Sequence, residues 1–186
     1  MGQDIAISGT GIAGLAAATA VLGAERDCVL FGPPTQVMAG GVQLAPNGWA
    51  ALSALGVAQD VMLRATRLHE ITVRSLTSEA TLARLPLTDD YASVARADLA
   101  NVLEQRIRQT GRFRWHNTSV EEASQTGASV NIIGKDTGLH HAAGLVAADG
   151  VAGFGRSFIS SQSRSTIKTS LATDKIASRS MVRLSD

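Results

Sequence analysis

A short apolar run followed by three regularly spaced glycines lies at the start of this chain. Residues 5–8 are Ile-Ala-Ile-Ser, and Gly9, Gly11 and Gly14 follow in the spacing G-x-G-x-x-G, before an alanine-rich segment. In this context the pattern predicts a buried strand, a tight turn and a helix over about residues 11–22. Gly9 would allow the tight turn, Gly11 would let the backbone approach a pyrophosphate, and Gly14 would let the helix pack closely on the strand.

The helix expected from this pattern begins beside the position expected for the phosphates. Its unpaired backbone N–H groups and the positive end of its dipole would attract an anion without a basic side chain. We therefore predict a ligand with a diphosphate group, such as a dinucleotide. A glycine-rich turn between a strand and a helix, with no ligand, is the alternative that these residues leave open.

The composition suits one domain of the α/β class. A chain of 186 residues with 45% hydrophobic residues can bury a substantial core, and its 18 glycines suit a fold with many tight turns. The formal net charge is only +1, so neither nucleic acid nor a membrane surface is expected as a partner. No apolar run approaches the length of a membrane span, and the N-terminus lacks the basic start of a signal peptide.

A second buried strand is predicted over residues 28–31, Cys-Val-Leu-Phe. Gly23 would end the preceding helix and residues 32–34 would end the strand, which completes a β-α-β unit. The only cysteine, Cys28, is interpreted as a buried thiol, which fits a reducing cytoplasm. Folds that bind NAD or FAD usually place Asp or Glu where Gly32 stands, to bind the adenosine ribose. Ribose recognition is therefore expected to be weak.

Two further helices are predicted. Residues 39–47, which include the pair Gly40-Gly41, are predicted as a loop that leads into a short helix over about residues 48–55, which a glycine closes. Between Asp98 and Gln109 the apolar residues repeat at helical spacing, and this helix would end at Gly111. Its apolar face would consist of Leu99, Val102, Leu103 and Ile107.

The remaining apolar segments predict strands over residues 70–74, 81–85, 113–116, 129–133 and 144–148. The first two would form a sheet separate from the nucleotide-binding unit. Residues 157–186 differ from the rest, because they are rich in serine and basic residues, contain no glycine and show no clear periodicity. We expect this segment to be a mobile or loosely attached tail.

Four motifs in order give the chain a resemblance to a known family. The first is the glycine fingerprint, and the second is Gly-Gly-Val-Gln-Leu-Ala-Pro-Asn at residues 40–47. The third is Arg-Ala-Asp-Leu at residues 96–99, and the fourth is Ala-Asp-Gly at residues 148–150. Together they resemble the FAD-dependent aromatic-ring hydroxylases, single-component flavoprotein monooxygenases related to salicylate and hydroxybenzoate hydroxylases.

The resemblance covers about residues 3–156 and implies a Rossmann-like FAD/NAD(P)-binding fold, with part of an antiparallel substrate-domain sheet inserted at about residues 69–95. In the family, the arginine that corresponds to Arg96 lies beside FAD, and the Asp-Gly motif that corresponds to Asp149 lies near FAD and influences the reduced nicotinamide. The FAD-binding residues that the resemblance implies are Gly9, Gly11, Ile12, Ala13, Gly14, Gly41, Arg96, Val120 and Asp149.

Simpler interpretations of three of these motifs stay open. Arg96 would also suit a surface salt bridge, Asp149 a plain Asp-Gly turn, and the pair Gly40-Gly41 a flexible hinge. The chain also departs from the family pattern, since Ala147 replaces a glycine and Gly153 replaces a serine.

After Arg156 the resemblance stops, without the family's second Gly-Asp motif or its remaining substrate-domain strands. We therefore expect a truncated member, with an FAD-binding domain over residues 1–156 and the tail over residues 157–186.

The resemblance implies that the flavin performs the redox chemistry: NAD(P)H reduces it, and with O₂ it hydroxylates a small aromatic substrate. No catalytic side chain is therefore predicted. No metal site is predicted either, because His140 and His141 lack metal-ligand spacing and are interpreted as a solvated pair. The alternatives are a catalytically inactive remnant of the FAD fold and an NAD(P)-dependent reductase, although a plain reductase does not need the strands within residues 70–85.

Overall fold

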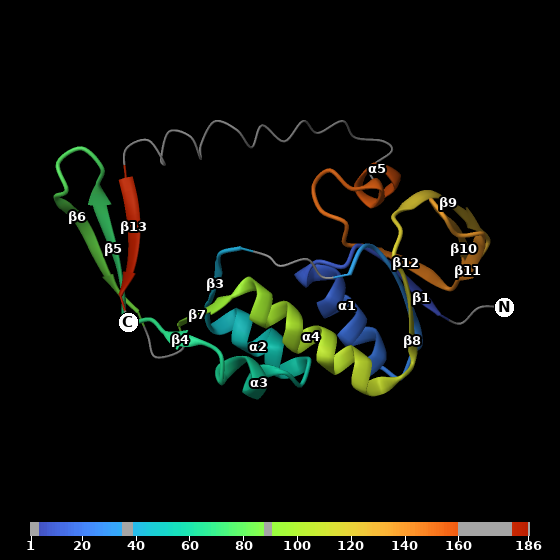
Figure 1. Cartoon of the computed structure of the whole chain (residues 1–186), viewed down its shortest axis with the longest axis horizontal. Helices are drawn as coiled ribbons and strands as arrows, with labels where there is room; N and C mark the ends of the chain where they lie inside the picture. Colours follow the sequence, from blue (N-terminus) through green and yellow to red (C-terminus); the bar gives the residue numbers. More distant parts are fainter. Residues whose placement is uncertain (1–3, 35–38, 88–90, 160–179, 186) are drawn as a thin grey trace.

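The computed structural model describes residues 4–34, 39–87, 91–159 and 180–185, and it is a mixed α/β structure (Figure 1). Its centre is a parallel sheet with the strand order β12-β1-β2-β8. All four strands lie where the sequence predicted them, and their bounds are β1 (Ile5–Ser8), β2 (Cys28–Phe31), β8 (Phe113–His116) and β12 (Gly144–Ala147).

Alternate residues of β1 and β2 face two different layers of the molecule. Ile7 and Leu30 belong to a core cluster that includes two helices. Ala6 and Val29 belong to a second cluster, formed with an antiparallel sheet on the opposite face. Because neither face of these strands meets water, their residues are apolar almost throughout, which makes them easy to identify in the sequence.

The two helices are α1 (Ile12–Gly23) and α4 (Arg96–Thr110), which pack against each other on one face of the sheet (Figure 1). Gly111, at φ +65°, ends α4 as predicted. The predicted end of α1 is early by one residue, because Gly23 is still helical and Ala24 is the cap. The apolar face predicted for α4 is buried, and it consists of Leu99, Val102, Leu103 and Ile107.

An antiparallel sheet of the order β11-β10-β9 covers the other face of the central sheet. Its strands are β9 (Val120–Thr126), β10 (Ser129–Gly134) and β11 (Leu139–Ala142). Only β10 was predicted. Most residues of β9 are polar and exposed, and the two central residues of β11 are histidines. The alternation of hydrophobic residues on which strand prediction depends is therefore weak in both strands.

A small antiparallel sheet and two short helices lie between β2 and α4 in the sequence. The segment predicted as a loop before the short helix contains a strand, which pairs with β7 and so completes a sheet of the order β3-β7-β4. The elements here are β3 (Gly41–Leu44), α2 (Pro46–Ala54), α3 (Ala58–Met62), β4 (Thr66–Arg67) and β7 (Ala92–Ala95).

A third antiparallel sheet lies apart from the rest of the molecule (Figure 1). Its strands β5 (Glu70–Ser75) and β6 (Thr81–Pro86) form the separate pair that the sequence predicted. Strand β13 (Ser180–Ser185) pairs with β5 along its whole length, although it belongs to the segment expected to be a loose tail. Helix α5 (Phe154–Ile159) also extends into that segment, whose residues 160–179 and 186 lie outside the described residues, so the domain boundary at residue 156 stays a prediction.

Candidate functional site

A cavity of about 580 Å³ opens where the carboxyl ends of β1, β2 and β12 meet the start of α1. This is the edge of a parallel sheet at which ligands of open α/β folds bind. Residues 8–11, 31–34, 119–120, 148–150 and 152–154 line the cavity. Segments that are far apart in the sequence therefore meet around one hollow.

Two of the three fingerprint glycines lie where no side chain fits. Gly9 has φ +102°, and a Cβ there would lie 2.3 Å from the carbonyl oxygen of Ala148. A Cβ on Gly14 would lie 1.9 Å from the carbonyl oxygen of Gly9. The turn and the close approach of helix and strand therefore require these glycines for the fold itself, as the sequence predicted.

The middle glycine lies in a different environment. Gly11 has the extended backbone φ −74°, ψ −176°, which any residue adopts, and a Cβ there would meet nothing within 4 Å. Nothing in the described fold requires glycine at this position. The open space faces the cavity, since Gly11 is one of its lining residues.

The start of α1 offers backbone donors to this space. The hydrogen bond from the N–H of Leu15 to the carbonyl of Gly11, at 2.9 Å, is the first in the helix, so the N–H groups of Ile12, Ala13 and Gly14 precede it. No side chain caps the helix, and its first turn has no acidic residue. The arrangement suits an anion at the helix N-terminus.

Asp149 lines the cavity and also joins the segments around it. Its Oδ2 atom accepts hydrogen bonds from the Ser8 hydroxyl and from the backbone N–H of Gly155, each at 2.9 Å. A Cβ on Gly153 would lie 2.2 Å from Asp149 Cγ, so the glycine that departs from the family pattern makes room for this carboxylate. Asp149 thus has a structural function of its own at the edge of the cavity, beyond the turn that Gly150 forms at φ +85°.

Gly41 and Arg96 lie together, but not among the residues that line the cavity. The backbone N–H of Arg96 donates to the carbonyl of Gly40 at 3.0 Å, which joins the start of α4 to the strand that begins at Gly41. A Cβ on Gly41 would lie 3.1 Å from the Ser93 hydroxyl, so this position is a close approach between β3 and β7. The Arg96 side chain is exposed and forms no salt bridge within the described residues. The role of Gly41 and Arg96 in FAD binding stays a prediction.

The cavity holds almost no charge of its own. Among the described residues that line it, Asp149 is the one with an ionisable side chain. Val120, which the resemblance implied as a contact, is buried at the start of β9 and belongs to the lining. The attraction for an anion therefore comes from the backbone N–H groups of α1 rather than from a lysine or arginine.

Sequence reasoning missed Thr10, Phe31 and Phe154 as lining residues. Thr10 is an unspecified position of the fingerprint, and Phe31 ends a strand that looked wholly structural. Phe154 comes close to the cavity only because α5 folds back after β12. The adjacency of Thr10 and Phe31 to the fingerprint and to the end of the second strand was the signal that could have identified them.

The interpretation of the histidine pair is correct for His141, which is exposed, and wrong for His140. The side chain of His140 is only 15% exposed, and its Nε2 lies 4.0 Å from Asp4 Oδ2. Burial, followed by the positive charge of Arg114, lowers the pKa of His140. Within the described residues, no group of three or more His, Cys, Asp or Glu side chains is placed to hold a metal ion. None of the described helices is long and apolar enough to cross a membrane.

Comparison with known proteins agrees with the resemblance seen in the motifs. No protein-family model matches the chain. It is 33% identical over 157 residues to a 3-amino-4-hydroxybenzoate 2-monooxygenase of Streptomyces platensis, an alignment that covers 79% of this chain and 39% of that protein. It is 27% identical over 158 residues to a 3-hydroxybenzoate 6-hydroxylase of Polaromonas naphthalenivorans, covering 79% of this chain and 40% of that protein. The chain thus spans about two fifths of the length of these relatives.

Solved structures show the same fold. The p-nitrophenol 4-monooxygenase of Pseudomonas putida superposes with a TM-score of 0.73 at 21% identity, over 86% of this chain and 43% of that one. A putative FAD-containing monooxygenase of Photorhabdus luminescens superposes with a TM-score of 0.69 at 15% identity, again over 86% of this chain and 43% of that one. In sequence and in fold, the chain resembles the N-terminal portion of the FAD-dependent aromatic hydroxylases.

Proposed function

We propose that the cavity binds FAD through its diphosphate, in a Rossmann-like arrangement. The observation that carries this proposal is the contrast among the fingerprint glycines: Gly9 and Gly14 are crowded, whereas Gly11 borders open space. Only a ligand that comes close to the backbone would require glycine at Gly11. The backbone N–H groups of Ile12 and Ala13 would then bind the phosphate oxygens.

The rest of the cavity fits a ligand longer than its diphosphate. Val120 and the segment 32–34 lie among the lining residues beside the fingerprint turn, and the segment 149–153 contributes lining residues on the β12 side. Asp149 would keep its two hydrogen bonds and hold the loop after β12 in place. Bound FAD would supply the redox chemistry, with NAD(P)H as reductant and O₂ as oxidant.

The substrate class that we propose is a small aromatic compound. Support comes from the relatives, whose names specify hydroxybenzoates. The chain spans about two fifths of the length of these relatives, and we propose that this portion alone hydroxylates such a compound. The buried lone cysteine, Cys28, supports our inference of a reducing compartment such as the cytoplasm.

A remnant of the FAD fold that binds flavin without turnover is the second candidate. The observation that favours it is the exposure of β6, all six residues of which are exposed on the sheet that the resemblance assigns to a substrate domain. The same sheet argues against a plain NAD(P)-dependent reductase, which has no need of it.

The experiment that tests both candidates is an absorbance spectrum followed by turnover. The purified chain is incubated with FAD, passed through a desalting column, and examined for flavin absorbance. Retained flavin together with NAD(P)H consumption that rises when a hydroxybenzoate is added would support the hydroxylase. Retained flavin with no aromatic-dependent consumption would favour the remnant, and NAD(P)H binding without retained flavin would favour the reductase.

A further inference from the structure

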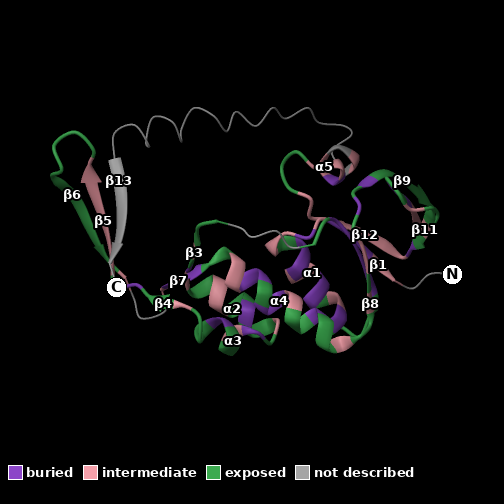
Figure 2. Ribbon diagram, viewed as in Figure 1, coloured by how far each residue is buried: buried purple, intermediate pink, exposed green. Residues whose placement is uncertain are grey.

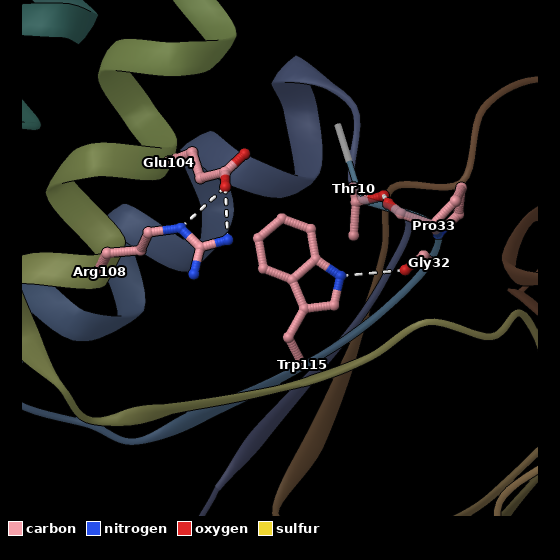
Figure 3. Close-up of polar contacts among 6 residues, drawn as sticks. All are labelled: Thr10, Gly32, Pro33, Glu104, Arg108 and Trp115. Atoms are coloured by element: carbon pink, nitrogen blue, oxygen red, sulfur yellow. Dashed lines mark hydrogen bonds and ion pairs between the residues drawn. The ribbon is translucent and has the colours of Figure 1, made fainter. Parts of the chain in front are cut away.

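One wall of the cavity consists of residues 32–34, which follow β2, and the N–H of Gly32 and the carbonyls of Gly32 and Pro33 already have partners. The N–H of Gly32 donates to the carbonyl of His116 at 3.0 Å. The carbonyl of Gly32 accepts a hydrogen bond from Trp115 Nε1 at 3.0 Å, as Figure 3 shows. Pro33 and Pro34 have no backbone N–H. The wall therefore has no free backbone donor.

The Thr10 side chain fills the space beside Gly32 in which a side chain at position 32 would lie. Its hydroxyl donates to the carbonyl of Pro33 at 2.6 Å (Figure 3), and its side chain is buried. A Cβ on Gly32, at φ +156°, would lie 2.6 Å from Thr10 Oγ1. The positive φ of Gly32 and the Thr10 side chain therefore both oppose a carboxylate at position 32 in this backbone.

The indole that holds the wall is itself fixed from the side of α4. The guanidinium of Arg108 lies over the ring of Trp115, 5.7 Å from its centroid. Arg108 is held in turn by hydrogen bonds of 2.8 and 2.6 Å to Glu104 Oε1 (Figure 3). The wall is consequently supported by packing that does not depend on a ligand.

We propose that this cavity selects a nucleotide by its diphosphate and not by its ribose hydroxyls, and that Thr10 is the residue that determines this specificity. The proposal rests on the proposed function, because it concerns the same FAD site. A ribose hydroxyl placed against this wall meets the hydrocarbon of two prolines and finds neither a backbone N–H donor nor a carboxylate there. The charge-assisted hydrogen bond that an acid at Gly32 would provide is absent.

The test is calorimetric titration of the full chain with ADP, 2′-deoxy-ADP and AMP. We expect ADP and 2′-deoxy-ADP to bind with dissociation constants within about twofold of each other, and AMP to bind at least about tenfold more weakly than ADP, because a phosphate at the helix N-terminus is lost. A preference of about tenfold or more for ADP over 2′-deoxy-ADP would overturn the proposal, since that is the size of one hydrogen bond to a charged group.

The arms of this titration separate the proposal from the proposed function. If ADP binds no better than AMP, or does not bind at all, the diphosphate site fails and the proposal fails with it. If ADP binds better than AMP and discriminates against the deoxy analogue, only the inference about the ribose fails.

A pair of variants tests the assignment to Thr10. Thr10→Gly combined with Gly32→Asp removes the contact with Thr10 while the aspartate still takes the positive φ of Gly32, so circular dichroism first confirms that the variant folds. We expect the folded variant to prefer ADP over 2′-deoxy-ADP by about tenfold. Thr10→Gly alone is the matched control and should show no preference. A folded double variant with no preference would overturn the role of Thr10, and if that variant does not fold, the ratio measured for the unaltered chain still decides the inference about the ribose.

Discussion

The central strands β1 and β2 of the parallel sheet and the strands β5 and β6 of the outer sheet differ sharply in burial, although all four were identified from the sequence (Figure 2). All four residues of β2 are buried, and β1 is buried in all but Ile5. All six residues of β6 are exposed, and none of those in β5 is fully buried. The hydrophobic pattern thus predicts a strand in each case, but it does not reveal what covers the strand.

The difference follows from the neighbours of each sheet. The parallel sheet has helices on one face and the β9-β10-β11 sheet on the other, so its central strands β1 and β2 are removed from water on both faces. The outer sheet leaves Leu82 60% exposed and Leu85 52% exposed. Stability should therefore be concentrated in the first region, and the following experiments measure how unequal the two regions are.

The largest effect is expected from matched leucine truncations. Leu103 on α4 is 1% exposed, so Leu103→Ala should lower the free energy of unfolding by about 2–5 kcal/mol through lost burial and a cavity. Leu85→Ala on β6 is the control and should cost less than about 1 kcal/mol, because half of its surface already meets water. Denaturant unfolding followed by circular dichroism measures both, and equal costs would contradict the contrast between the regions.

Substitutions at two glycines of α1 test how closely this helix packs against the parallel sheet. Gly14→Ala places a Cβ against the backbone of Gly9 and should destabilise the fold by about 1–3 kcal/mol or more. Gly23→Ala, at the other end of the same helix, meets nothing within 4 Å and should be neutral or stabilising by up to about 1 kcal/mol. Thermal unfolding compares the two variants, and an unchanged melting temperature for Gly14→Ala would contradict the close approach of helix and strand at this position.

Cys28 provides a chemical probe of the same region. Burial, followed by the charges of Asp27 and Asp4, raises the pKa of its thiol from 9.0 to about 11. The thiolate fraction near neutral pH should therefore fall about 100-fold, and alkylation should be slow until the chain unfolds. Mass spectrometry after iodoacetamide treatment, with and without denaturant, tests this expectation, which rapid labelling of the folded chain would refute.

The smallest effect concerns the dependence of stability on pH. Burial lowers the pKa of His140 below its ordinary value of 6.5, so below that pH the unfolded chain binds a proton that the folded chain resists. The free energy of unfolding should therefore decrease as the pH falls from 6.5 toward the lowered pKa. His140→Gln should flatten this part of the profile, and a profile identical to that of the unaltered chain would argue against the lowered pKa of His140.

Elements with strong local signals were predictable from the sequence. The first strand, helix and second strand have apolar runs and glycines whose spacing reports their geometry, and α4 has a regular apolar face. Strands β3, β4, β7, β9, β11 and β13 were missed because their local sequences lack a clear run or alternation of apolar residues, and they form by pairing with neighbouring strands. His140 was misjudged for the same reason, since its burial comes from the packing of β11 rather than from its local sequence.

In the candidate site, too, residues with a strong local pattern were predictable and the others were not. Gly9, Gly11 and Gly14 were assigned separate roles from their spacing, and the surroundings of Gly9 and Gly14 match those roles. At Gly32, the sequence predicted only that the acid that usually binds the ribose is missing. That Thr10 fills the space and Trp115 holds the carbonyl depends on contacts between positions 23 and 83 residues apart, which no local pattern reports.

The most direct test of the central claim is a fluorescence titration of FAD into the unaltered chain and into Gly11→Ala, with circular dichroism to confirm that both are folded. The unaltered chain should bind one FAD, and Gly11→Ala should keep its stability yet bind FAD at least about tenfold more weakly, because the added methyl group would occupy open space at the proposed diphosphate site. A folded, unaltered chain that binds no FAD, or a Gly11→Ala variant that binds it equally well, would contradict the proposed site.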